Sequence, residues 1–148
     1  MNLNEAKILH ELLYTFMGQF HEKVLIKFRQ VSPFPSWVKK NHSKIINLLY
    51  QRDYLTLTEI GKRLDIEKGS LTTLIDQMEE KGFVIRSDDP CDRRKSLISL
   101  SPQSRTLMDQ VMDLHTQELN EIFENVDSSE VQQFLSSLQN VVDFMKRV

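Results

Sequence analysis

Residues 55–101 read LTLTEIGKRLDIEKGSLTTLIDQMEEKGFVIRSDDPCDRRKSLISLS, and this stretch decides the fold. Its apolar spacing predicts a short helix over 56–64 and a second helix over 68–81. Two strands follow, over 83–87 and 96–100, around a charged tip. Two helices with a short link and a hairpin behind them form a winged helix-turn-helix. The predicted fold class is therefore mainly α with a small β-hairpin wing.

Both helices carry start or stop signals. Thr56 and Glu59 have the spacing of a capping box, in which each side chain binds the other's free backbone N–H. In the second helix, apolar residues recur at i, i+3, i+4 and i+7 from Leu71, so this face points toward the core. Gly82 ends the second helix, because glycine adopts the left-handed conformation at low cost.

The outer face of the second helix is polar and mostly uncharged. Ser70, Thr73 and Gln77 form one stripe, with Gly69 and Thr72 beside it. Short donors and acceptors of this kind suit base edges and phosphate oxygens in a DNA major groove. A solvated helix face has the same pattern, because amphipathic helices present polar residues outward. The helix alone leaves both interpretations open.

A basic cluster at the hairpin tip favours DNA binding. Arg93, Arg94 and Lys95 lie where the two strands turn, away from any apolar run. An arginine at such a tip can enter the narrow, electronegative minor groove. Asp92 beside them either holds the tip rigid or neutralises it. The alternative is a charged loop that keeps an edge hairpin from aggregating.

Residues 55–101 resemble the DNA-binding core of the MarR family, the multiple-antibiotic-resistance-type repressors. The resemblance lies in LTLTEIGKRL, in a second helix ending MEEKGFVIR, and in the segment DDPCDRRKSLISLS. The family's wing signature is matched by Asp92, Arg93, Arg94, the apolar pair 97–98 and the ending 100–101. The resemblance implies a repressor, released by a small ligand, that binds double-stranded DNA at a palindromic operator as a homodimer.

The candidate DNA-binding residues lie at the start of the first helix, on the second helix and at the wing tip: Thr56, Thr58, Lys68, Gly69, Ser70, Thr72, Thr73, Gln77, Asp92, Arg93, Arg94 and Lys95. The family often has arginine at the positions of Thr73 and Gln77, so this second helix is less basic than usual. Glu67 stands where a Ser or Thr cap is common, and Ser104 replaces a usual glycine. The less basic helix keeps one alternative open, a winged-helix module that binds proteins without binding DNA.

A long amphipathic helix is predicted before this core. Residues 4–30 keep apolar side chains at helical spacing up to Phe28. The proline-containing segment 32–36 breaks the chain, because the residue before each proline is pushed out of helical conformation. A further helix is predicted over 37–52, with Ser36 as its cap.

Two more helices are predicted after the hairpin. Ser101 caps the first, with Pro102 at its first position, where proline is favoured. This helix runs to about residue 125. Asp127 or Ser128 caps the last helix, which extends to about residue 146 and carries a heptad-like apolar seam that typically packs on other helices.

These flanking helices have more apolar surface than one chain can cover. We therefore expect the helices over 1–31 and 102–148 to pack against a second subunit and form a dimer. The 148-residue chain is then a single unit of the fold, with its winged-helix DNA-binding region over 37–101. A two-fold dimer would also place two recognition helices on one DNA face. The resemblance implies the same dimer.

Composition narrows the function classes. A net charge of −2 argues against indiscriminate nucleic-acid coating. Residues 106–148 carry two basic against eight acidic residues, so this end should face away from DNA. No run of eighteen apolar residues and no signal-peptide pattern is present, so neither a membrane partner nor secretion is expected. The single cysteine, Cys91, fits a reducing cytoplasm.

No enzyme, cofactor or metal site is expected. The chain lacks HExxH, CxxC, GxSxG and phosphate-loop patterns. The pairs His21–Glu22 and His115–Glu118 could bind zinc, but structural zinc sites usually show tighter spacing. Cys91 beside the wing arginines could sense oxidation, or simply occupy a variable position of the wing.

A small aromatic or phenolic ligand is implied by the resemblance. MarR-like proteins often bind such molecules in a cleft between the dimer helices and the winged core. Phe20, Phe34 and Trp37 lie at the corresponding place in the chain. Trp37 is the best candidate, because its indole N–H needs a partner. Phe20 fits a plain core residue better than a ligand contact.

Overall fold

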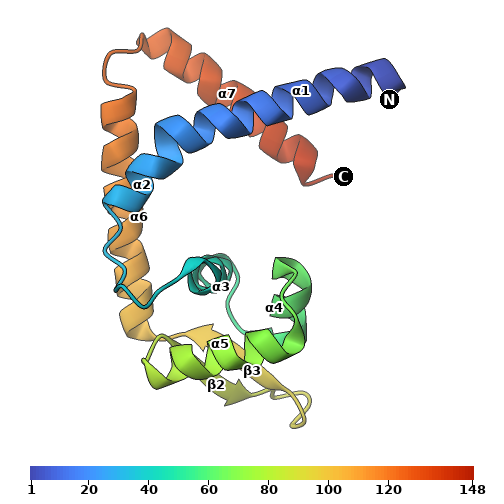
Figure 1. Cartoon of the computed structure of the whole chain (residues 1–148), viewed down its shortest axis with the longest axis vertical. Coiled ribbons are helices and arrows are strands. Elements are labelled where there is room, and N and C mark those ends of the chain that lie inside the picture. Colours follow the sequence, from blue (N-terminus) through green and yellow to red (C-terminus); the bar gives the residue numbers. More distant parts are fainter. The chain divides into compact units, whose positions relative to one another are not determined.

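A computed structural model describes all residues from Met1 to Val148 as a set of helices with one small sheet (Figure 1). The chain divides into two compact units. We call Pro33–Met112 the winged-helix unit, and Met1–Ser32 together with Asp113–Val148 the helical unit. Each is described by itself.

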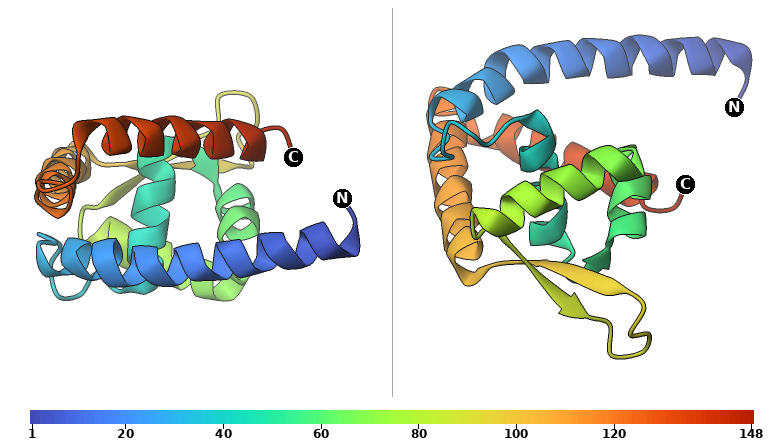
Figure 2. Two further views of the ribbon diagram at one scale, coloured as in Figure 1. Left: turned by 90° about the horizontal axis from the view of Figure 1, so that it is seen from above. Right: turned by 60° about the horizontal axis from the view of Figure 1, so that its bottom comes forward.

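The winged-helix unit contains three complete helices and one sheet. The helices are α3 (Lys40–Gln51), α4 (Leu57–Leu64) and α5 (Lys68–Glu80), and the first part of α6 (Pro102–Ile122) completes the unit. The strands are β1 (Leu55–Thr56), β2 (Val84–Asp88) and β3 (Ser96–Leu100), antiparallel in the order β1-β3-β2. Figure 2 shows β2 and β3 extending as the hairpin that forms the wing.

The sheet has one strand more than the sequence predicted. β1 is only two residues long, and it pairs Leu55 with Ile98 and Thr56 with Leu97. Two residues are too few for an alternating pattern, so the strand leaves no periodic signal. Its pairing ties the start of α4 to the wing.

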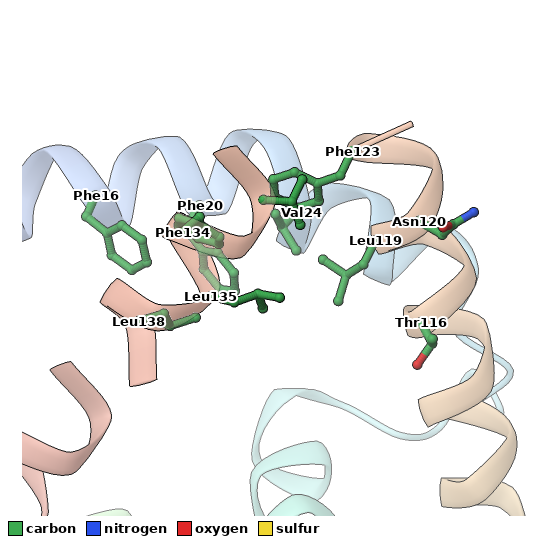
Figure 3. A pocket seen from close by; sticks show the side chains of 11 residues that line it. Phe16, Phe20, Val24, Thr116, Leu119, Asn120, Phe123, Phe134, Leu135 and Leu138 are labelled. Atoms are coloured by element: carbon green, nitrogen blue, oxygen red, sulfur yellow. The ribbon is translucent and has the colours of Figure 1, made fainter. Parts of the chain in front are cut away.

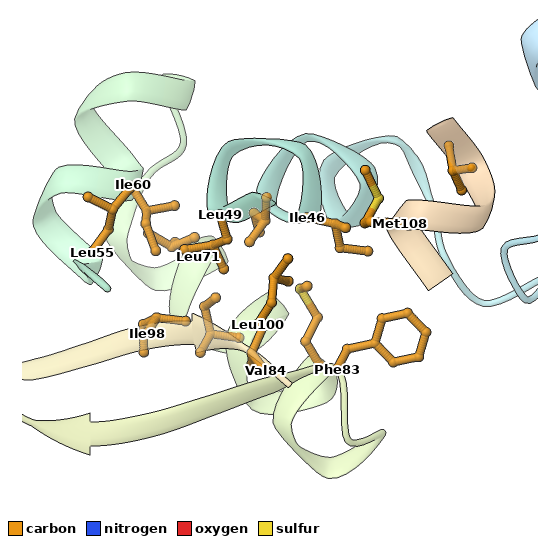
Figure 4. Packing of buried hydrophobic residues seen from close by; sticks show 14 residues of the cluster. Ile46, Leu49, Leu55, Ile60, Leu71, Phe83, Val84, Ile98, Leu100 and Met108 are labelled. Atoms are coloured by element: carbon orange, nitrogen blue, oxygen red, sulfur yellow. The ribbon is translucent and has the colours of Figure 1, made fainter. Parts of the chain in front are cut away.

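The core of this unit draws on every element (Figure 4). Its members are Ile45, Ile46 and Leu49 from α3, Leu55, Ile60, Leu71, Ile75 and Met78 from β1, α4 and α5, and Phe83, Val84, Ile98, Leu100, Met108 and Val111 from the wing and α6. Each fully buried aliphatic side chain contributes roughly 1.5–3 kcal/mol. Burial of the inner face of α5 fixes which of its residues face outward.

The predicted helix boundaries around α4 and α5 are confirmed. Thr56 Oγ1 accepts the Glu59 N–H (3.2 Å), and the Glu59 carboxylate accepts the Thr56 N–H (2.8 Å). Gly82 has φ +73°, the left-handed conformation that glycine adopts cheaply. Ser101 Oγ accepts the Ser104 N–H at the start of α6 (3.1 Å).

The predicted start of α3 is wrong by three residues. The helix begins at Lys40, not Trp37, and Ser36 is not its cap. Instead the ring nitrogen Nδ1 of His42 accepts the backbone N–H of Lys39 (3.0 Å), which satisfies a donor at the helix start. Residues 36–37 form a turn, in which the Val38 N–H donates to the Pro35 carbonyl (2.9 Å).

The helical unit begins with one long, continuous helical segment. It comprises α1 (Leu3–Phe20), the π-helical turn η1 (His21–Leu25) and α2 (Ile26–Gln30). The sequence predicted a single helix over 4–30, and the structure adds the π turn. Asn2 and Glu5 form a capping box at its start.

The rest of α6 and α7 (Ser128–Met145) complete the helical unit. α6 ends at Ile122, three residues before the predicted end near 125. Asp127 caps α7 by accepting the Ser129 N–H (2.8 Å). The ring of His115 on α6 stacks on Phe28, with centroids 3.8 Å apart.

Most apolar side chains of the helical unit are exposed. Neither α1 nor α7 contains a buried residue. The exposed large side chains include Leu9, Leu12, Leu13, Phe16 and Met17 on α1, and Phe134, Leu135, Leu138, Val141 and Val142 on α7. None of the helices combines the length and apolarity that crossing a lipid bilayer requires.

Candidate nucleic-acid interface

The outer stripe of α5 is exposed. Ser70, Thr73 and Gln77 lie on this stripe, and Lys68 and Gly69 are exposed at the start of the helix. Glu67, the N-cap, makes no side-chain capping bond. The backbone N–H groups of the first turn therefore lack the side-chain partner that Ser or Thr would supply.

The two threonines of α5 direct their hydroxyl protons to their own helix. Thr72 Oγ1 donates to the Lys68 carbonyl (2.9 Å), and Thr73 Oγ1 donates to the Gly69 carbonyl (3.3 Å). A hydroxyl used as a donor retains acceptor capacity. Thr73 therefore presents an acceptor oxygen and a methyl group on the exposed face.

Gln77 is exposed, but its side chain has a partner inside the unit. Its Oε1 lies 3.3 Å from Nε2 of His42 on α3. His42 is buried, with 6% of its surface exposed. The sequence did not identify this pair, because nothing local links residues that are 35 positions apart.

The two candidates at the start of α4, Thr56 and Thr58, differ in whether they take part in capping the helix. Thr56 uses its hydroxyl in the capping box, where it also donates to the Glu59 carboxylate (3.0 Å). Hydrogen bonds from the backbone and then the side chain of Thr56 lower the pKa of Glu59. Thr58 is exposed and makes no such cap. Thr56 is thus committed to holding the helix start.

An ion-pair fork joins the wing to α5. Arg86 on β2 contacts Asp76 Oδ1 through Nη2 (2.5 Å) and Glu79 Oε2 through Nη1 (2.7 Å). Both carboxylates belong to α5, so the guanidinium offsets part of the negative charge beside the exposed stripe. The sequence did not single out Arg86, because its partners come from another element.

The wing tip is basic, exposed and internally hydrogen-bonded. Arg93, Arg94 and Lys95 are exposed, and the Arg94 side chain is 91% exposed. Asp92 Oδ1 accepts both the backbone N–H and Nε of Arg94 (3.1 Å each). These bonds, the side-chain one first, lower the pKa of Asp92. Cys91 is exposed at the same tip.

Two of the aromatic candidates for ligand binding, Phe34 and Trp37, lie in the winged-helix unit and pack against its core. The ring of Trp37 packs edge-on against His42 and Phe83, with centroids 5.3 and 4.7 Å away. Phe34 is partly buried against the core. Phe20 belongs to the helical unit.

Each unit has a cavity of about 450 Å³. Figure 3 shows the one in the helical unit, where Phe16, Phe20 and Val24 face Leu135 and Leu138 of α7. The cavity in the winged-helix unit is lined by Pro33, Pro35, Phe83, Gln103, Leu107 and Gln110, among others. Phe34 and Trp37 line neither of the two.

The amino-acid sequence is similar to known helix-turn-helix proteins. The profile described as the MarR family matches residues 40–96. The HTH-type transcriptional regulator YsmB of Bacillus subtilis is 30% identical over 99 residues, which cover 67% of this chain and 68% of that protein. YkoM of the same organism, also described as an HTH-type transcriptional regulator, is 30% identical over 95 residues. That match covers 64% of this chain and only 62% of YkoM.

Solved structures share the fold over nearly the whole chain. A MarR family protein from Bacillus stearothermophilus has a TM-score of 0.76 at 20% identity, covering 99% of both chains. FabT of Streptococcus pneumoniae, solved in complex with DNA, has a TM-score of 0.64 at 20% identity, covering 96% of this chain and 98% of FabT. BpsR of Bordetella bronchiseptica, whose DNA binding is described as regulated by 6-hydroxynicotinic acid, has a TM-score of 0.60 at 20% identity, covering 87% of this chain and 91% of BpsR.

Proposed function

Because the chain belongs to the MarR family, we propose that it is a sequence-specific DNA-binding regulator of transcription. It acts as a homodimer on a palindromic operator, as a repressor that a small ligand releases. The observation that carries the proposal is the winged-helix unit, which exposes an uncharged polar stripe on α5 and a basic wing tip.

In this proposal α5 enters the major groove. Ser70, Thr73 and Gln77 supply hydrogen-bonding groups to base edges. Lys68 and Gly69 lie at the helix start, where backbone N–H groups and the helix dipole attract phosphate. FabT, which shares the fold, has been solved in complex with DNA, and this supports the DNA-binding mode.

The wing tip reaches the adjacent minor groove. The groove has strong negative potential where it is narrow, so Arg93, Arg94 and Lys95 are attracted there. Asp92 sets the position of Arg94 by accepting hydrogen bonds from its backbone N–H, Nε and Nη2. The contact contributes affinity more than sequence discrimination, since the minor groove displays a degenerate pattern.

The homodimer forms through residues 1–31 and 102–148. The exposed apolar side chains of α1 and α7 support this, because a monomeric protein rarely leaves so many large apolar groups in water. Two-fold symmetry presents two α5 helices to DNA, and the operator is then a palindrome of two half-sites.

The ligand is a small aromatic or phenolic molecule. BpsR supports this, because its DNA binding is described as regulated by an aromatic acid. The cavities of about 450 Å³ fall in the size range of small-molecule sites. Phe20 lines the cavity in the helical unit, and this supports it as the aromatic candidate for ligand binding.

The test is a DNA selection with the full chain, followed by fluorescence anisotropy on the enriched sequence and on DNA from upstream of its gene. We expect a palindromic site bound at nanomolar concentration, with affinity that falls steeply as salt rises. An aromatic acid such as salicylate should weaken binding. A folded protein that enriches no sequence would contradict the proposal, and would favour instead a winged-helix module that binds proteins.

A further inference from the structure

We propose that His42 determines which bases Gln77 reads, because it holds the Gln77 side-chain amide with its oxygen turned toward the protein and its NH₂ group outward. This inference rests on the proposed DNA-binding function. His42 would be a positioning residue that does not itself contact DNA.

The first step is the proton on the His42 ring. Nδ1 of His42 lies 3.0 Å from the backbone nitrogen of Lys39, which is a donor. Nδ1 must therefore act as an acceptor and carry no proton. In the neutral ring the proton is then on Nε2.

The second step is the orientation of the Gln77 amide. Nε2 of His42 is 3.3 Å from Oε1 of Gln77. A protonated ring nitrogen can only donate, so it must face the amide oxygen. The flipped amide would place its NH₂ group against the ring N–H, two donors with no acceptor between them.

The third step is the rigidity of the ring. His42 is 6% exposed, and the Trp37 ring packs edge-on against it at a 69° interplanar angle. Trp37 in turn packs edge-on against the buried Phe83. Swinging His42 away would uncover this aromatic cluster and leave the Lys39 N–H without its partner. The bond to Gln77 thus links α3 to the exposed face of α5.

The consequence is a restricted hydrogen-bonding pattern. A free glutamine reads adenine with both groups, accepting from N6 and donating to N7. The Gln77 oxygen keeps a second lone pair, but its bond to His42 turns it toward the protein, so the NH₂ group is the part of the amide that faces outward. Donors match guanine best, which shows two acceptors, N7 and O6, in the major groove. We therefore expect guanine to be preferred over adenine at the base pair that Gln77 contacts.

The test compares His42→Asn with the wild-type full chain on the selected operator. The asparagine oxygen can replace Nδ1 as acceptor for the Lys39 N–H, but it removes the donor to Gln77. The guanine-over-adenine preference at one position should fall about three- to tenfold, the factor of one net hydrogen bond, while other positions keep theirs. In a Gln77→Ala background, His42→Asn should change no base preference further. Gln51→Asn, exposed at the end of α3 and outside the proposed DNA-binding and dimerisation residues, is the control.

A second measurement needs no DNA and no variant. ¹⁵N NMR of wild-type His42 at alkaline pH should show a protonated Nε2 and an unprotonated Nδ1. The opposite tautomer would overturn the inference, and so would an unchanged guanine preference in a folded His42→Asn protein. Failure of both the wild-type chain and the control variant to select DNA would overturn the proposed function itself. That result does not depend on His42.

Discussion

At the residue scale, the Arg94 side chain at the wing tip is 91% exposed. Replacing Arg94 with alanine should weaken binding to all sequences, with a modest extra loss on sites flanked by A·T tracts. The slope of log affinity against log salt should decrease by about one unit per lost contact, hence about two per dimer. Fluorescence anisotropy over a salt series measures both effects.

Arg52→Ala is the control for lost charge, because Arg52 is exposed and lies outside α5, the wing tip and the dimerisation helices. Thermal unfolding should be unchanged in both variants, since exposed side chains contribute little to stability. If the Arg94→Ala protein had wild-type affinity for DNA and a wild-type salt slope, the wing would not be part of the DNA-binding surface.

Arg86 gives a second prediction at this scale. Arg86→Met leaves the carboxylates of Asp76 and Glu79 uncompensated beside the stripe that we propose faces DNA. DNA affinity should fall severalfold through repulsion of phosphates, whereas the free energy of unfolding should change by only about 0–1 kcal/mol, as for exposed ion pairs. Adding Asp76→Asn and Glu79→Gln should restore most of the affinity. Failure of this rescue would show that Arg86 acts on wing geometry or on DNA directly.

These residues also show the limit of sequence reasoning. The wing arginines could be found because a local signature surrounds them, and the stripe on α5 because helical periodicity places it outward. Arg86 and His42 could not, since each acts through partners on another element. The pairing of His42 with Gln77 exists only after α3 and α5 pack together.

At the scale of elements, the capping box of α4 predicts an acid-dependent loss of stability. Hydrogen bonds from Thr56 lower the pKa of Glu59 below its ordinary value of 4.5. A lowered pKa means that the carboxylate stabilises the folded state above that value, and that this contribution is lost as pH falls through the folded pKa. Glu59→Gln can keep a capping hydrogen bond but cannot ionise.

The variant should be less stable than wild type at pH 7 by about 0.5 kcal/mol, as is typical of a charge at an exposed helix N-terminus. The difference should shrink below pH 4.5. Urea unfolding at a series of pH values measures it, with Glu80→Gln as control. A constant difference across pH would mean that the charge of Glu59 does not contribute.

The sequence predicts whether a segment is a helix or a strand where the apolar periodicity is strong. It predicts where a helix begins or ends where a common capping residue is present. α4, α5, β3 and the start of α6 follow from such signals. The start of α3 was missed because a histidine side chain, not Ser36, satisfies the first free N–H. The two-residue β1 was missed because it exists only through pairing with β3.

At the scale of the whole molecule, the exposed apolar side chains of α1 and α7 predict a dimer. Sedimentation velocity at micromolar concentration should show two chains. Removing residues 131–148 should cause aggregation, because the apolar surface of α1 then has nothing to cover it. Leu138→Asp should shift the protein toward monomer, while Ser136→Asp on the same helix should not. A monodisperse, folded monomer of the wild-type chain would contradict the dimer.

The π turn at His21–Leu25 sets the phase of the N-terminal helix. A π turn accommodates about one residue more than an α turn, and each residue rotates an α-helix by about 100°. Deleting Lys23 should therefore restore an ordinary helix and keep Leu9 and Phe16 in phase with Phe28, whereas deleting both Glu22 and Lys23 should turn them by about 100° relative to Phe28. Circular dichroism should be unchanged in both variants, while dimerisation should fail only in the double deletion. Failure of dimerisation in the single deletion would contradict this account of the π turn. In genetic terms, this stretch tolerates the loss of one codon but not of two.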